Sequence, residues 1–176
     1  MAIIIYAFII WTALGLINKT TNQPSGLGRL ACILSGLIFV MILSGGLVAG
    51  TRAGYAYSTW PLMGDSFIPA GLYAMTPTWL SAFEDITTIQ FNHRIFAYII
   101  AALVVGFSVI ALRQDISTQA RIGIYCMLFL LVLQITLGIS TLIFYVPVAI
   151  AAAHQIGAVA LLTATLFVSH SLVNRT

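Results

Sequence analysis

Two histidines are the residues of this chain with the clearest capacity for chemistry. His93 and His154 each lie near the start of a separate, strongly apolar segment. An imidazole inside a membrane is costly unless it has a partner, so its presence by default marks a functional site. Two neutral imidazoles at one depth can provide both axial bonds to a haem iron between helices. The pair therefore predicts a metal site at His93 and His154 that holds a haem, with ordinary helix packing as the alternative for each ring.

Polar residues near the two histidines indicate how a haem would be held. Arg94 and Arg52 are expected to bind the haem propionates, because guanidinium groups form charge-assisted hydrogen bonds with carboxylates. Interfacial anchoring is the alternative for Arg94. Gln90 and Gln155 are candidates for hydrogen bonds to the ligating rings. The third histidine, His170, lies about 24 Å further along its helix and is expected at the opposite membrane interface.

The composition indicates the surroundings of this site. The chain has 176 residues, of which 61% are hydrophobic and 6% charged, and its formal net charge is +3. Its mean hydropathy is +1.08. A soluble domain carries about 25% charged residues. We therefore expect an integral membrane protein, embedded in a lipid bilayer and without a nucleic-acid partner.

Apolar runs divide the chain into membrane spans, each of which needs about 20 residues to cross the hydrocarbon core. They predict an all-α membrane protein with five transmembrane helices, near residues 2–17, 29–49, 91–112, 120–144 and 148–170. Residues 18–28 are expected to form an inner loop, and residues 29–176 a haem-binding four-helix bundle. The long connection 50–90 is rich in Trp and Pro, which predicts an ordered cap at the outer membrane interface.

The basic residues predict the orientation in the membrane. Five spans place 18–29, 113–121 and the C-terminus on one side. Five of the seven Lys and Arg residues lie there: Lys19, Arg29, Arg113, Arg121 and Arg175. Because positive residues collect on the inner side, we expect the C-terminus in the cytoplasm or mitochondrial matrix and the long loop outside.

Several strings of residues resemble the second half of haem A synthases of the proteobacterial and mitochondrial type. They are Gly45–Gly54, Thr59-Trp60-Pro61-Leu62-Met63, Gln90-Phe91-Asn92-His93-Arg94 and Ala153-His154-Gln155. The resemblance runs from about residue 30 through nearly all of the remaining chain. It implies an enzyme that oxidises the C8 methyl of haem O to the formyl group of haem A for cytochrome oxidase. It also implies a haem b held by one histidine from each of two helices, at the positions of His93 and His154.

The resemblance also implies a first half, with its own two histidines and a glutamate, that holds the substrate haem. This chain has Gln90 where that glutamate would fall, so no catalytic residue is expected here. Residues 1–17 resemble the last helix of that first half. We therefore expect one part of a split oxidoreductase in a bacterial or mitochondrial inner membrane, active with a second membrane subunit that carries the substrate half.

Two other functions are compatible with the same residues. One is a cytochrome b with two histidine ligands that transfers electrons as a homodimer. The other is a non-catalytic scaffold subunit of a respiratory assembly, in which the haem is lost.

Overall fold

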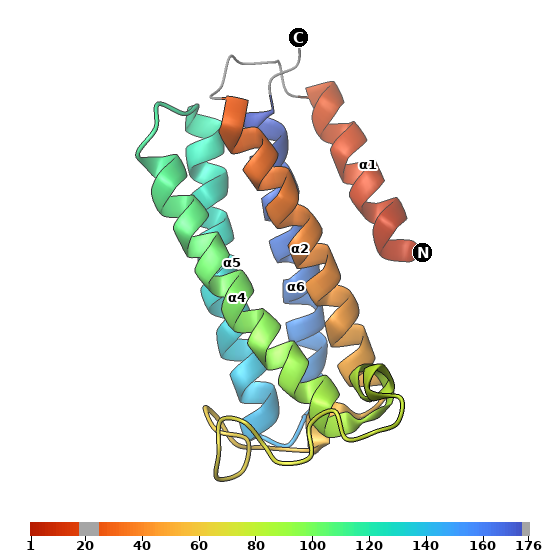
Figure 1. Cartoon of the computed structure of the whole chain (residues 1–176). Helices are drawn as coiled ribbons and strands as arrows, with labels where there is room; N and C mark the ends of the chain where they lie inside the picture. The colour runs from red at the N-terminus through yellow and green to blue at the C-terminus, as the bar shows by residue number, and fades with distance from the viewer. Residues whose placement is uncertain (18–24, 174–176) are drawn as a thin grey trace. The chain divides into compact units, whose positions relative to one another are not determined.

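The computed structural model describes residues 1–17 and 25–173, and helices make up the regular structure of these residues apart from one isolated bridge. The helices are α1 (Ala2–Ile17), α2 (Ser25–Gly50), α3 (Ser81–Glu84), α4 (Ile86–Leu112), α5 (Thr118–Ile143) and α6 (Val148–Leu172), with short 3₁₀ turns η1 (Ala53–Tyr55) and η2 (Thr78–Leu80) (Figure 1). Among the described residues, α2, α4, α5 and α6 are long and apolar enough to cross a membrane, and α1 is a shorter apolar helix. The expectation of an all-α integral membrane protein is confirmed.

Two of the long helices begin earlier than the sequence predicts. α4 begins at Ile86 rather than near 91, because Asp85 caps it: the carboxylate accepts a hydrogen bond from the backbone N–H of Thr88 at 2.8 Å. α2 begins at Ser25 rather than near 29, so residues 25–28 are helical and not part of a loop. In this first turn the backbone of Gly28 packs so closely against the Leu172 carbonyl that a side chain would not fit. The rest of the expected inner loop, 18–24 with Lys19, lies outside the described residues, as does Arg175.

The pattern of contacts divides the chain into two compact units. The first, here called the α1 unit, comprises Met1–Phe39, Ile100–Val132 and Val159–Thr176. The second, called the histidine unit, comprises Val40–Ile99 and Leu133–Ala158. Each of the four long helices contributes residues to both units.

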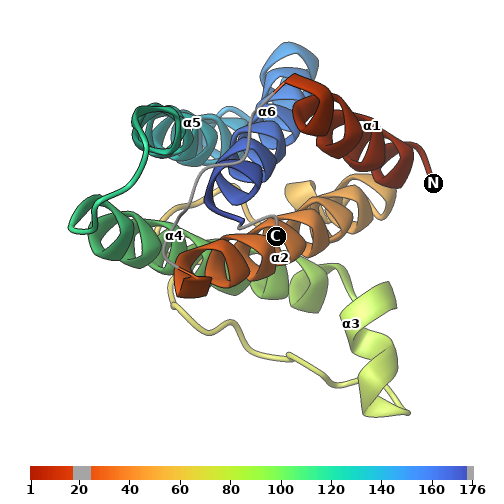
Figure 2. The same ribbon diagram turned by 90° about the horizontal axis from the view of Figure 1, so that it is seen from above.

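In the α1 unit, α1 lies beside α2 and α6 (Figure 2). The Tyr6 and Thr163 hydroxyls are hydrogen-bonded at 2.7 Å, and the Trp11 and His170 rings meet edge to face at 5.3 Å between centroids. No residue of α1 is fully buried. The three helices leave a cavity of about 260 Å³ between them, so α1 is attached by a few contacts along one face.

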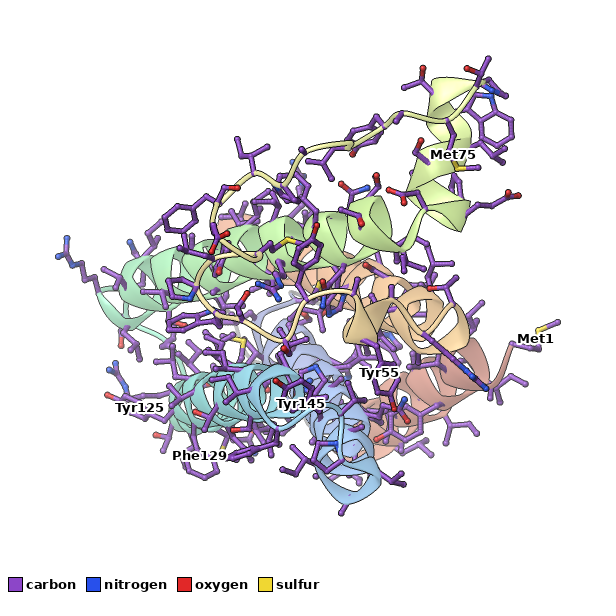
Figure 3. All side chains as sticks on the ribbon, turned by 90° about the horizontal axis from the view of Figure 1, so that it is seen from below. Met1, Tyr55, Met75, Tyr125, Phe129 and Tyr145 are labelled. Atoms are coloured by element: carbon purple, nitrogen blue, oxygen red, sulfur yellow. The ribbon has the colours of Figure 1, made fainter. Side chains whose placement is uncertain are left out.

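In the histidine unit, the connection between α2 and α4 is an ordered structure attached to α4. The Thr59 hydroxyl donates to the Leu62 carbonyl at 2.9 Å and accepts from the Gly64 N–H at 2.9 Å. The Tyr73 hydroxyl donates to Asn92 of α4 at 2.6 Å. Figure 3 shows Met75 beside α3, and its N–H donates to the Ser81 hydroxyl at 3.1 Å. The expectation of an ordered cap agrees with these contacts.

Candidate functional site

Both candidate metal ligands belong to the histidine unit. His93 lies near the N-terminal end of α4 and His154 near the N-terminal end of α6. Each side chain is half-buried. The structure therefore places the two histidines that the sequence paired in one compact unit.

The ring of His93 is held by residues at the C-terminal end of α2. Its Nδ1 lies 3.0 Å from the Ser44 hydroxyl oxygen, which is hydrogen-bonding distance. The next residue is Gly45, where a Cβ atom would lie 3.4 Å from Cε1 of the same ring. Because Ser44 engages Nδ1, the other ring nitrogen, Nε2, is the one left for a metal.

The ring of His154 packs against a glycine of α5. A Cβ atom on Gly138 would lie 2.9 Å from Cε1 of His154, so the ring occupies the space that a side chain there would need. The reverse contact is closer still, because a Cβ atom on Gly157 of α6 would overlap Oε1 of Gln134. The Gln134 side-chain N–H also donates to the His154 carbonyl at 2.8 Å. Gly138 of α5 thus lies against the ring of His154, and Gly157 of α6 lies against the side chain of Gln134.

Gln134 is a functional candidate that the sequence reasoning missed. Gln155, the expected partner of His154, is exposed, and the glutamine in contact with His154 lies 20 residues earlier in the chain, on α5. A single amide inside an otherwise apolar span was the available signal, since polar side chains in a membrane bond to neighbouring helices. The sequence alone could not decide whether Gln134 or Gln155 contacts His154, because that depends on how the residues of α5 align with those of α6.

Gln90 and Arg94 fasten the cap to α4. The Gln90 amide N–H donates to the Tyr57 carbonyl at 2.9 Å, so the expected bond from Gln90 to a histidine ring is absent among the described residues. Two guanidinium nitrogens of Arg94 donate to the carbonyls of Leu62 at 3.1 Å and Tyr57 at 3.2 Å. Gln90 is 2% exposed and Arg94 is 8% exposed. The two side chains therefore hold the backbone of residues 54–62 against the N-terminal part of α4.

The two arginines differ in what remains available for an anion. The Nε atom of Arg94 is buried and has no hydrogen-bond partner among the described residues. The described part of the chain also gives its charge no carboxylate partner, only carbonyl groups. Arg52 is exposed at the turn between α2 and η1, in the left-handed conformation with φ of 59°. One guanidinium thus carries an uncompensated buried charge, and the other is open to the surroundings.

These features fit a haem with two histidine ligands. Gly45 and Gly138 leave space beside the two rings that any side chain would reduce. Two nitrogen donors without a protein carboxylate or thiolate suit haem ligation, in which the porphyrin supplies the other four bonds. The buried Nε of Arg94 and Nδ1 of His154 are polar atoms that lack partners within the described residues.

The fold and these residues define the chain as an integral membrane helical protein with a pair of intramembrane histidines. It belongs to the COX15-CtaA family of cytochrome oxidase assembly proteins, whose profile matches residues 1–166.

Individual relatives agree with this assignment. A protein of Nitrosospira multiformis named "Heme A synthase" is 45% identical over 177 residues, which cover 98% of this chain and 50% of that protein. The human "Heme A synthase COX15" is 36% identical over 176 residues, which cover 97% of this chain and 43% of that protein. The chain thus spans about half the length of the curated relatives it matches. No solved structure gives a significant match.

Proposed function

We propose that this chain is the haem b-binding half of a haem A synthase. It takes part in oxidising the C8 methyl of haem O to the formyl group of haem A for cytochrome oxidase. The observation that carries the proposal is the pair His93 and His154, each packed against a glycine of a neighbouring helix. Membership of the COX15-CtaA family and the relatives named haem A synthase support it.

In this proposal each site residue has a distinct task. His93 and His154 hold the iron, and Arg94 and Arg52 neutralise the propionates. The uncompensated charge of Arg94 supports its role, because a buried cation is stabilised by a nearby carboxylate. Haem b, when bound, supplies a one-electron redox centre. Gln90 and Arg94 keep the cap over this part of α4 and so limit the access of water to the site.

We further propose that a separate membrane chain supplies the substrate half and that α1 docks against it. In support of such docking, α1 presents exposed apolar side chains such as Phe8 and Ile9. The excess of basic residues on one side of the spans supports a cytoplasmic or matrix C-terminus and an outward-facing loop.

A pull-down from native membranes tests this function. The tagged chain is purified in mild detergent, its pigments are extracted, and its co-purifying proteins are identified. Haem b together with haem O or haem A and a second multi-span protein is the expected result. Haem b alone would favour a separate electron-transfer cytochrome, and formation of haem A by this chain without a partner would contradict the split enzyme.

A further inference from the structure

We propose that the two histidines are held unequally: Ser44 orients the ring of His93, whereas the ring of His154 is held by packing alone. His154 is then the weaker ligand and the one that an added ligand replaces. This inference rests on the proposed haem site, and it concerns which residues of this chain set the strength of each bond.

The case for Ser44 begins with the two nitrogens of an imidazole. A ring that binds iron through Nε2 carries its proton on Nδ1 and donates it to a hydrogen-bond acceptor. The Ser44 hydroxyl oxygen lies 3.0 Å from Nδ1 of His93 and is placed to be that acceptor. A donated hydrogen bond fixes the rotation of the ring and makes the ligating nitrogen more basic. Ser44 is therefore a positioning residue for His93.

His154 has no equivalent of Ser44. Its Nδ1 is buried and has no hydrogen-bond partner among the described residues. Gln134 bonds to the backbone carbonyl of His154, which positions the helix and leaves the ring free of that bond. The contact that limits the ring is Gly138, where a Cβ atom would come within 2.9 Å of Cε1. Steric contact restricts the ring but does not raise the basicity of its nitrogen.

Substitution of Ser44 tests the positioning role. We expect Ser44→Ala in the full chain to weaken haem binding about tenfold, since loss of such a partner costs 10- to 100-fold in metal affinity. Because the iron ligand becomes less basic, the reduction potential should rise and the low-spin electron paramagnetic resonance signal should shift. Ser44→Thr, which keeps a hydroxyl group, should restore both.

Ser35→Ala is the matched control. Ser35 is another serine of α2, and its buried hydroxyl lies 2.9 Å from that of Ser169 in the α1 unit. Its substitution should leave the potential and the spectrum unchanged. Equal values for Ser44→Ala and Ser35→Ala would overturn the role of Ser44.

The inequality of the ligands has its own test, the haem content of the His154→Ala and His93→Ala chains. We expect His154→Ala to retain several-fold more haem than His93→Ala. Its remaining ligand is His93, the ring that Ser44 orients. Circular dichroism confirms that both chains keep their helices, and equal or reversed retention would overturn the inequality. A wild-type chain without any Soret band would instead refute the haem site itself. Failure of the haem site can therefore be distinguished from failure of the proposed inequality between its ligands.

Discussion

At the scale of single residues, the site depends on glycines that leave room for imidazole rings. Gly45 and Gly138 lie on different helices, and each faces one histidine. Small residues at these positions let a helix approach its neighbour closely. The approach is tighter at His154, where the added Cβ would be 2.9 Å from the ring, than at His93, where it would be 3.4 Å away. The two glycines should therefore differ in how well they tolerate a methyl group.

Substitution of Gly138 by alanine should displace the ring of His154 and weaken haem binding by about tenfold, the range expected when a ligand loses its support. Gly46→Ala is the control, because a Cβ atom there meets nothing within 4 Å. The measurement is a haem titration followed at the Soret band. Equal affinity of the two variants would show that the close contact at Gly138 does not position His154.

At the scale of elements, α4 is joined to the cap by Gln90 and Arg94. Their donors reach carbonyls that lie more than 30 residues earlier in the chain, at Tyr57 and Leu62. A hydrogen bond contributes about 0.5–1.5 kcal/mol to stability, and about 1.5–3 kcal/mol when its donor is charged, as in Arg94. The ordered path of residues 54–62 therefore depends on these two side chains, which lie one helical turn apart on α4.

Removing the Gln90 amide should loosen the cap without melting the helices. We expect Gln90→Ala to increase the rate of chymotrypsin cleavage within residues 51–85 by about tenfold, which corresponds to about 1.4 kcal/mol of local stability. Tyr73→Phe removes only a hydrogen bond between exposed groups and should change the rate less than twofold. Equal cleavage of Gln90→Ala and the wild type would mean that Arg94 alone secures the cap.

The sequence was sufficient to predict the helices but not the contacts between them. Length and apolarity alone identify the spans, because the bilayer sets both. The role of Gln134 needed the register between α5 and α6. The hydrogen bonds of Arg94 depend on the path of a connection 35 residues long, which no local pattern specifies.

At the scale of the whole molecule, α1 and the histidine pair are expected to serve different purposes. The contacts of α1 fall in the α1 unit, for example those of Tyr6 and Trp11, whereas both histidines belong to the histidine unit. No residue of α1 is fully buried, so this helix contributes no residue to the buried core. Docking to a partner chain is therefore the proposed purpose of this helix.

Deletion of residues 1–17 tests this division. We expect the shortened chain to keep its haem content within about twofold, because α1 contributes none of the residues around His93 or His154. It should lose the second multi-span protein in the native-membrane pull-down. Loss of haem with the partner retained would assign α1 to the haem site instead.

The central claim is that His93 and His154 together hold one haem b. The most direct measurement is the haem content and absorption spectrum of the full chain, purified from membranes that synthesise haem, beside the double variant His93→Ala/His154→Ala. We predict one haem b per wild-type chain with a low-spin, two-histidine spectrum, and none in the double variant. A wild-type chain without a Soret band, or a double variant that keeps the same spectrum, would contradict the claim.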